Sequence, residues 1–557
     1  MTLFHKIHYM TKKITTLFIA IILVIGSVSF TDNYFEIAKN LDIFTTVYRE
    51  LNNFYVDETD PGKLMKTAID KMLKSLDPYT NYIPESEIED FKFMTTGQYG
   101  GIGAIITKRD DFVYINEPYK DSPAQKAGLM AGDKILRIDG LDAKGKTTEE
   151  VSKVLKGQPD TEVKLLIERP YISKPFEVSF KRQKISVKSI PYYSYLSDNI
   201  GYIKLRSFTR DCSKDVKNAL IDLKERGDLR GLILDLRNNP GGLLNESVDI
   251  VNLFVEKGQE VVSTRGKIES WAKTYKASKP PLDLEIPLIV LINQSSASAS
   301  EIVAGSIQDL DRGVIIGQRS YGKGLVQQTK KLSYNSQLKL TVAKYYIPSG
   351  RCIQALDYSN RNKDGSVGKI PDSLMTAFKT KNGRTVFDGG GIQPDIETKE
   401  EEISNLIVSL VRERLFFDYA TLYRYQNPNL RNDSSFRFSN DDFLLFEEFL
   451  SDKSYDYKTE TEKAFEALKK KSEKESYFNL IEQEYDRLYN EFELNKKNDL
   501  VRNKDVIKEI LSQEISGRYF YQEGEIRTAL SFDNDVNKAI DYLSDSDLYD
   551  AVLGSTY

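Results

Sequence analysis

The sequence predicts a multidomain α+β protein: a helical N-terminal segment, a small turn-rich β module, an α/β core and a helical C-terminal domain. Three observations predict this order. Short strand-like runs between glycine turns fill residues 97–170, apolar strands alternate with helix-like stretches from 200 to 396, and apolar residues recur at helical spacing after about residue 399. A chain of 557 residues that is 40% hydrophobic can form three or four domains with cores of their own.

Residues 1–30 have the layout of an export signal. Lys6, Lys12 and Lys13 precede an uncharged run, "ITTLFIAIILVIGSVSF" (14–30), and small residues at 27–29 could form a cleavage site. The alternative is an uncleaved anchor, because a run of this length lies at the lower limit for spanning a bilayer. That anchor would associate the chain with a membrane through residues 14–30. In both cases we expect the folded part to lie in a periplasm-like space.

Residues 31–94 are predicted to be a helical region. Its apolar residues Ile43, Val47, Leu51 and Tyr55 recur at helical spacing. The turn-forming stretch "LDPYTNYIP" (76–84) is expected to end these helices.

Residues 95–170 look like a separate small module. The run "DSPAQKAGLMAGDKILRIDG" predicts a short helix, a glycine stop and a strand, residues 148–155 a second helix, and residues 162–168 a strand. This pattern resembles a PDZ domain. The resemblance implies that a glycine-rich loop, matched here by Gly101, Ile102 and Gly103, binds a peptide's terminal carboxylate while the adjoining strand adds the peptide to the sheet. The alternative for these glycines is a tight turn.

Residues 171–400 are predicted to form the α/β core. "GLILDLRNNPGG" and "PLIVLIN" are strands, the second apolar throughout as in a buried parallel strand. Directly after it, "SSASAS" (295–300) leads into a predicted helix. A nucleophilic serine at this place needs a base.

The histidine count removes the commonest base. The only two histidines, His5 and His8, precede the apolar stretch and belong to the export signal. A Ser-His-Asp triad and a histidine-ligated metal are therefore excluded, and we expect no metal and no cofactor. A lysine can serve as base when burial lowers its pKa. Lys323, between two glycines in "SYGKGLVQQ", is the candidate.

The motifs of this core identify a family. "SSASASEIVAGSIQD", "GQRSYGKGLVQ", "DLRNNPGG" and "GGGIQPDI" resemble the carboxyl-terminal processing, or tail-specific, serine proteases, and the likeness covers roughly residues 35–400. It implies that Ser298 is the nucleophile and Lys323 the base. It also implies that Gln327, one helical turn later, orients the lysine.

The resemblance further implies an oxyanion hole beside Ser298. The Ala299 N–H at the start of the helix is one expected donor, since the first N–H groups of a helix have no partner within it. The second is expected from the glycine pair Gly241 and Gly242, and the sequence does not choose between them.

Several neighbouring residues have simpler interpretations. Ser295, Ser296 and Ser300 are expected to be loop and N-cap residues. Glu301 is interpreted as a partner of the helix dipole and Asp309 as structural. Cys212 and Cys352 are expected to be isolated thiols, and the net charge of −5 gives no reason to expect nucleic acid.

Residues 401–557 are predicted to be a helical accessory domain. One apolar stripe runs from Ile403 to Leu415 and another from Phe478 to Phe492, separated by the charged stretch "EKAFEALKKKSEKES" (462–476), interpreted as solvated. Core packing is the preferred interpretation of both stripes, with a homodimer or an adaptor protein as alternatives.

The sequence as a whole predicts an exported serine endopeptidase with a Ser-Lys dyad. Its expected substrates are unfolded or C-terminally tagged polypeptides with apolar C-termini, recognised by the PDZ domain. The alternative is a non-catalytic periplasmic PDZ scaffold or adaptor, which the complete set of Ser298, Lys323 and Gln327 argues against.

Overall fold

The computed structural model describes residues 34–197, 199–362, 364–399, 402–430, 436–496 and 498–554. The expected export signal lies outside these ranges. Within them, no helix is both long enough and apolar enough to cross a bilayer. The chain divides into two compact units, Met1–Tyr82 and Ile83–Tyr557, which are described separately.

The first unit is helical, as expected. Residues 34–54 form one helix and α2 (Pro61–Lys74) a second, begun by Asp60, whose carboxylate accepts the Lys63 N–H at 3.0 Å. The predicted turn follows, with both the Tyr79 and Thr80 N–H groups donating to Asp77 at 2.8 Å. The short strand β1 (Asn81–Ile83) spans the division between the units.

The second unit begins with a lead-in to the PDZ module. The turn η1 (Glu85–Glu87) is followed by α3 (Ile88–Thr96) and β2 (Gln98–Gly101). Gly97 ends α3 at φ +67°, a conformation that favours glycine, and its N–H donates to the Phe93 carbonyl at 2.7 Å. β2 pairs with β9 (Gln183–Ser186), so the two ends of the module meet.

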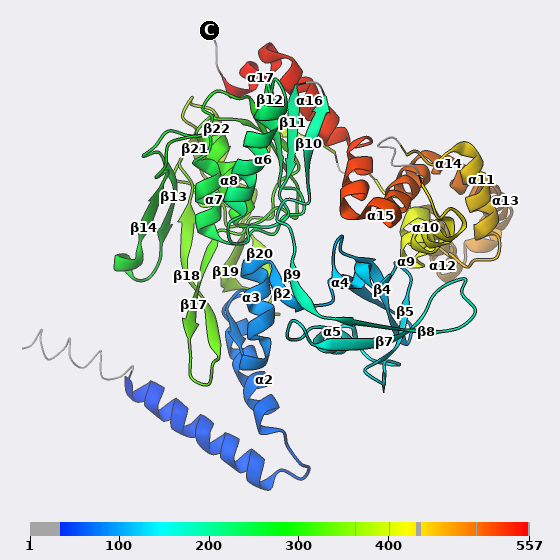
Figure 1. Ribbon diagram of the computed structural model, residues 1–557, viewed down its shortest axis with the longest axis horizontal. Helices are drawn as coiled ribbons and strands as arrows, with labels where there is room; N and C mark the ends of the chain where they lie inside the picture. The colour runs from blue at the N-terminus through cyan, green and yellow to red at the C-terminus, as the bar shows by residue number, and fades with distance from the viewer. Residues whose placement is uncertain are drawn as a thin grey trace, which may run out of the picture. The chain divides into compact units, whose positions relative to one another are not determined.

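The module itself is a small sheet with two helices, as in a PDZ domain (Figure 1). The capping box of Thr147 and Glu150 starts α5, and β3 lies at the edge of the sheet. The strands in spatial order are β3 (Ala104–Arg109), β4 (Phe112–Pro118), β5 (Lys134–Ile138), β7 (Glu162–Glu168) and β8 (Phe176–Lys181), with β6 (Leu141–Asp142) beside β5 and with helices α4 (Pro123–Lys126) and α5 (Thr148–Leu155).

A six-stranded sheet forms the core of the α/β region. Its first strand is antiparallel to the second and the others are parallel. The central strands are apolar because both faces are covered: Leu232, Ile233 and Leu234 are all fully buried. The strand order is β10 (Tyr192–Ser197), β11 (Ile200–Lys204), β12 (Gly231–Asp235), β15 (Leu288–Ile292), β16 (Val314–Gly317) and β23 (Ile396–Glu397).

Different parts of the chain cover the two faces of this sheet. Helices α6 (Cys212–Arg226), α7 (Leu244–Val251) and α8 (Ala299–Asp309) pack on one face. The other face packs against α16 (Asn534–Ser544) and α17 (Ser546–Leu553), from the end of the chain (Figure 1). The Leu288 N–H donates to the Tyr549 hydroxyl at 2.9 Å in this layer. The last two helices thus lie in the predicted C-terminal domain yet complete the core.

A second sheet stands beside the first. The hairpin of β17 (Leu325–Lys331) and β18 (Gln337–Tyr346) pairs through β18 with β13 (Glu260–Arg265), which pairs with β14 (Lys273–Lys276). The remaining short elements are η2 (Glu269–Trp271), β19 (Leu356–Arg361), β20 (Val367–Lys369), η3 (Asp372–Leu374), β21 (Ala377–Lys379) and β22 (Thr385–Phe387).

The helices after residue 404 form a cluster with an aromatic core. Of the first predicted stripe, Leu406, Ile407 and Leu410 are buried, but Ile403 and Val411 are exposed, so the stripe is narrower than expected. The cluster consists of α9 (Asn405–Arg412), α10 (Leu415–Gln426), α11 (Asn440–Leu450), α14 (Asp499–Arg502) and the first part of α15 (Lys504–Leu530).

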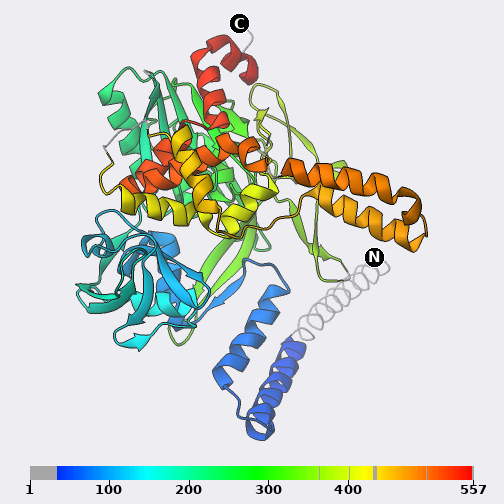
Figure 2. The same ribbon diagram turned by 90° about the vertical axis from the view of Figure 1, so that its right-hand side faces the viewer.

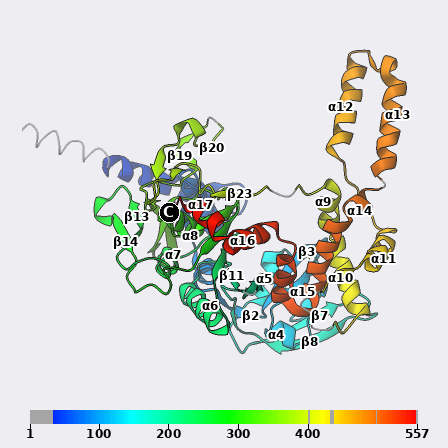
Figure 3. The ribbon, with the colours of Figure 1, turned by 90° about the horizontal axis from the view of Figure 1, so that it is seen from above.

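A helical hairpin extends from this cluster (Figures 2 and 3). It consists of α12 (Glu460–Lys474) and α13 (Phe478–Lys496). The charged stretch 462–476, expected to be solvated, is mostly helix α12. Its Phe465 ring packs against Tyr485 and Tyr489 of α13, with ring centroids 5.5 and 5.9 Å apart. Packing between the two helices therefore uses part of the second stripe.

Candidate active site

Ser298 lies in the turn between β15 and α8. Its backbone has φ 57° and ψ −111°, a conformation that side-chain-bearing residues rarely adopt. Such strain costs about 1–3 kcal/mol and persists where the surroundings fix it, often at functional sites. The next residue, Ala299, begins α8, so Ser298 stands beside the unpaired N–H groups of a helix start.

The other serines of this turn are occupied elsewhere. The Ser296 hydroxyl donates to the Leu236 carbonyl at 2.8 Å, and the Ser300 hydroxyl donates to the Asn239 carbonyl at 2.9 Å. Both side chains are buried, and Ser295 is exposed away from the cleft. Of the four, Ser298 alone lines the cleft described next.

A cleft of about 780 Å³ brings the predicted residues together. Ser298, Lys323 and Gln327 all line it, and so do Ala299 and the glycine pair at 241–242. The cleft also has an apolar wall, to which these residues contribute: Phe91, Phe93, Met94, Leu243, Leu244, Ile302, Leu325 and Val326.

The carboxylate of Glu301 ties the serine turn to the lysine loop. One oxygen, Oε2, accepts the N–H of Ser298 at 2.7 Å and the N–H of Lys323 at 2.9 Å. The other oxygen accepts the Gly322 N–H at 2.7 Å and the Ser320 hydroxyl at 2.6 Å. Burial raises the pKa of Glu301, and these four donors act against the rise. Sequence reasoning gave Glu301 only a dipole role and missed this one.

Tyr345 of β18 makes a second link between the same two residues. Its hydroxyl lies 2.5 Å from the carbonyl of Lys323 and 3.1 Å from that of Ser298. Both partners are acceptors, so the single phenolic proton is shared between them and favours the closer one. No sequence pattern near Tyr345 points to this role.

Gln327 lies on a strand rather than a helix. The interval from Lys323 to Gln327 was expected to be one helical turn, but Lys323 lies in the loop before β17 and Gln327 on β17 itself, and both line the cleft. The Gln327 amide donates to the Thr341 hydroxyl of β18 at 3.2 Å. The pairing of β17 with β18 thus holds the glutamine in place.

The structure distinguishes the two glycines of the expected oxyanion hole. The Gly241 N–H donates to the Asn239 Oδ1 at 2.9 Å, and Gly241 is buried. A Cβ on Gly241 would lie 2.8 Å from that of Ser298, so only glycine allows this approach. Gly242 is exposed and lines the cleft.

Asn239 is a further residue that sequence reasoning missed. Its buried side chain donates to the Leu205 carbonyl at 2.9 Å, and its own carbonyl accepts the Ala297 N–H at 3.0 Å. Together with its bond to Gly241, these contacts join the glycine turn to the serine turn. Its place in "DLRNNPGG" was the available clue.

The residues predicted to bind a carboxylate in the PDZ module do not line this cleft. Gly101 ends β2, paired with Gln183, and Ile102 is buried in the core of the module. Gly103 has φ +76°, and a Cβ there would lie 2.5 Å from that of Ser122. The segment leads directly into the edge strand β3.

Comparison with known proteins shows which family the chain resembles. Residues 199–359 match peptidase family S41, residues 114–169 a PDZ domain, and residues 406–543 a probable PDZ-protease C-terminal helical domain. A carboxy-terminal-processing protease of Bartonella bacilliformis is 39% identical over 329 residues, covering 58% of this chain and 75% of that protein. The chain belongs to the carboxy-terminal-processing proteases of family S41. It is a serine peptidase.

Other members of the family match similar shares of the chain. A probable CtpA-like serine protease of Staphylococcus aureus is 34% identical over 405 residues, covering 67% of this chain and 80% of that protein. A solved structure of a photosystem II D1 C-terminal processing protease is 27% identical with a TM-score of 0.36, covering 64% of this chain and 92% of that one.

Proposed function

We propose that this S41 protease is an exported endopeptidase that cuts unfolded or C-terminally tagged proteins with a Ser298–Lys323 dyad. In this mechanism the neutral amine of Lys323 accepts the proton of the Ser298 hydroxyl while the serine oxygen attacks the peptide carbonyl. Lysine then returns the proton to the leaving amine, and a water molecule, activated in the same way, hydrolyses the acyl-enzyme.

The oxyanion formed in both steps needs donors that are in place beforehand. The N–H groups of Ala299 and Gly242 are proposed to supply them. Gln327 is proposed to position Lys323. The side-chain amide of Gln327 is itself held by Thr341 on the neighbouring strand β18. These assignments follow from the location of each residue around the cleft.

The observation that carries this proposal is the shared anchoring of Ser298 and Lys323. Both side chains line one cleft, while both main chains are fixed by the same oxygen of Glu301. A lysine that shares its anchor and its cleft with the one cleft-lining serine of this turn has a chemical use that a scaffold protein would not need.

The test is degradation of β-casein by purified full-length variants. Ser298→Ala and Lys323→Ala should each abolish cleavage with unchanged thermal unfolding, and the double variant should be no worse because the two act as one unit. Ser295→Ala and Lys330→Ala, which alter exposed residues outside the cleft, are the matched controls. Substantial activity in Ser298→Ala would refute the assignment.

The proposed substrates are polypeptides with apolar, free C-termini. The apolar wall of the cleft supports apolar segments near the cut, and the edge strand β3 supports addition of a peptide strand to the PDZ sheet. Inactive Ser298→Ala enzyme should bind an apolar peptide acid more tightly than its C-terminal amide. Equal affinities by calorimetry would refute carboxylate recognition at Gly101–Gly103.

The helical hairpin α12–α13 is the proposed contact for a second copy or an adaptor. It leaves several large apolar side chains exposed: Leu468, Tyr477, Leu480, Leu488 and Leu494. Light scattering on a variant with Leu480 and Leu494 changed to Ser tests this contact, because the mass of the assembly should fall. An unchanged mass of the assembly would refute it.

A further inference from the structure

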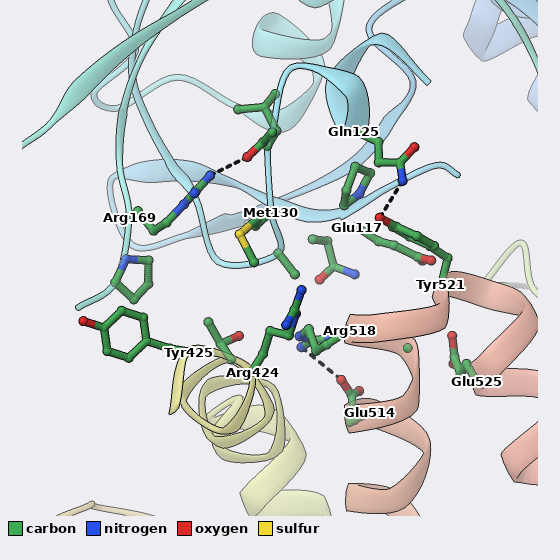
Figure 4. A pocket seen from close by; sticks show the side chains of 18 of the residues that line it. Glu117, Gln125, Met130, Arg169, Arg424, Tyr425, Glu514, Arg518, Tyr521 and Glu525 are labelled. Carbon is green, nitrogen blue, oxygen red and sulfur yellow. Dashed lines mark hydrogen bonds and ion pairs between the residues drawn. The ribbon is translucent and has the colours of Figure 1, made fainter. Parts of the chain in front are cut away.

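A second pocket lies between the PDZ module and the C-terminal helices, apart from the catalytic cleft (Figure 4). Its volume is about 320 Å³, at the lower end of the range of small-molecule sites. The PDZ wall comes from β4, α4 and the following turn, and from residues 169–171. The opposite wall comes from α10 and α15.

Specific polar contacts hold the two walls together. Arg109 binds the Asp418 carboxylate through two bonds of 3.0 and 2.8 Å, and the Gln125 amide donates to the Tyr521 hydroxyl at 2.7 Å. Arg414 donates to the Asn116 side chain at 3.1 Å. The pocket is therefore built into a defined interface.

One side of the pocket is lined by two arginines. Arg424 and Arg518 both point into it (Figure 4), and the Nε of each is buried without an acceptor among the described residues. Arg518 binds Glu514 at 3.1 Å and donates to the Phe417 carbonyl at 3.3 Å, whereas Arg424 donates to the Pro428 carbonyl and stacks over the Tyr519 ring at 4.4 Å. By contrast, Arg169 is fully engaged with Asp133 and a main-chain carbonyl.

The other side has two carboxyl groups, one half-buried on Glu117 and one exposed on Glu525. Glu117 of β4 and Glu525 of α15 stand on the side of Tyr521 (Figure 4). Burial raises the pKa of Glu117 to about 7 with a further rise from Glu525, and burial also raises the pKa of Glu525. Arg518 and Arg206 face both carboxyl groups and act against these rises without cancelling them. A ligand cation placed there would stabilise both ionised carboxylates.

Backbone strain marks the same place. Within α15, Tyr521 has φ 57° and ψ −160°, which breaks the helix. This region of conformational space is almost restricted to glycine, and a tyrosine there costs about 1–3 kcal/mol. The bond from Gln125 holds the Tyr521 side chain at the pocket's edge.

We propose that this interdomain pocket binds a small zwitterion, a free amino acid or a short peptide. Its ammonium group lies toward Glu117 and Glu525. Its carboxylate lies toward the guanidinium groups of Arg424 and Arg518. An apolar side chain of the ligand packs against Leu129 and Met130. Because it contacts both walls, the ligand strengthens the attachment of the PDZ module to the helices.

The test is calorimetry on the full chain carrying Ser298→Ala, with the dipeptide alanyl-leucine as probe. Binding with an affinity in the millimolar range or better is expected, together with a higher unfolding temperature. N-acetylation removes the ammonium charge and C-amidation removes the carboxylate charge, so each should weaken binding at least tenfold. No binding, or equal binding of the capped peptides, would overturn the proposal.

Two variants locate the site. Arg424→Gln should lose the preference for the acid over the amide, and Glu525→Gln should lose the preference for the free amine. Arg502→Gln, an exposed arginine of α14, is the matched control and should bind as the parent does. If both pocket variants keep the parent's preferences, the dipeptide binds in the PDZ groove or the catalytic cleft and the proposal is wrong. The comparison of capped peptides does not depend on the folding of any pocket variant.

Discussion

Ser298 and Lys323 donate their main-chain N–H groups to the same oxygen of one buried carboxylate, at 2.7 and 2.9 Å. These residues are 25 positions apart and come from different loops, so the Glu301 acceptor sets the separation of the two segments. Since proximity and orientation govern dyad chemistry, a displacement of about 1 Å would slow it strongly. Glu301 is thus a positioning residue for the proposed dyad.

Replacing this carboxylate by the isosteric amide should reduce turnover. In Glu301→Gln one acceptor oxygen becomes an NH₂ group, which faces buried N–H donors. Each donor that is left without an acceptor costs about 1–3 kcal/mol of stability. We expect kcat on a peptide substrate to fall about 10- to 100-fold, corresponding to about 1.4–2.7 kcal/mol, with KM nearly unchanged.

A matched control separates positioning from stability. Glu246 also accepts two main-chain N–H groups, from Asp211 and Ser213 at 2.9 Å each, but does not line the cleft. Glu246→Gln should lower the unfolding temperature and leave kcat alone. Equal kcat losses in the two variants would mean that general destabilisation, not positioning, explains the effect of Glu301.

Removal of the Tyr345 hydroxyl should have a smaller effect on the same step. Tyr345→Phe keeps the ring and loses the hydrogen bond to the Lys323 carbonyl, worth about 0.5–1.5 kcal/mol. We expect kcat to fall about two- to tenfold at constant KM. Tyr346→Phe, on the next residue of β18, is the control; a wild-type kcat for Tyr345→Phe would contradict the linking role.

The sequence predicted the local elements and motifs of this protein well, and the links between distant segments poorly. Strand alternation predicted β7 and helical spacing predicted α5 because these signals lie within the element. The serine and lysine motifs likewise pointed to Ser298 and Lys323, which line one cleft. The roles of Glu301 and Tyr345 depend on contacts between segments far apart in the chain, and no local pattern encodes them.

A side chain added to either glycine of the turn at 241–242 should clash with its neighbours and lower activity. A methyl group on Gly241 would meet Ser298, and one on Gly242 would lie 2.3 Å from the Phe208 carbonyl oxygen. Gly241→Ala and Gly242→Ala should each disturb the oxyanion donors and lower kcat by about 10²–10³. Gly258→Ala is the control, because Gly258 also has a positive φ (+93°) but open space around it. Activity near wild type in Gly242→Ala would exclude that turn from the oxyanion hole.

Glu117 should make stability depend on pH. Its pKa is about 7 in the folded protein and near 4.5 when unfolded, because burial and Glu525 oppose ionisation more than Arg518, Arg206 and the Gln522 N–H favour it. The folded state therefore holds the proton more tightly. Its contribution is fully present below pH 4.5 and is lost as the pH rises toward 7, by at most about 3 kcal/mol.

The measurement is thermal unfolding of wild type and Glu117→Gln between pH 5 and 8. The wild-type protein should lose stability relative to the variant as the pH rises, with the difference levelling above about pH 7. Glu149→Gln, on the exposed side of α5, should keep the wild-type dependence. Parallel curves for wild type and Glu117→Gln would contradict the burial of an ionisable group at this interface.

Two parts of the C-terminal region, helices α16–α17 and the hairpin α12–α13, should respond differently to deletion. A chain that ends at residue 533 lacks α16 and α17, which cover one face of the core sheet, and it exposes apolar side chains such as Ile233, Ile289 and Leu291. Arg237, which binds Asp535, also loses a partner. At about 25 cal/mol per Å² of apolar surface, uncovering that face removes many kcal/mol, so we expect insoluble or unfolded protein without activity.

Replacing residues 460–496 by a short Gly-Ser linker removes only the hairpin α12–α13, whose aromatic rings pack on each other. This variant should keep an unfolding temperature and a rate of casein cleavage near those of the wild type. Circular dichroism, size-exclusion chromatography and the casein assay on both variants decide the matter. A folded, active chain ending at 533 would show that the second layer of the sheet is dispensable, and loss of cleavage with the hairpin would show that the hairpin takes part in binding casein.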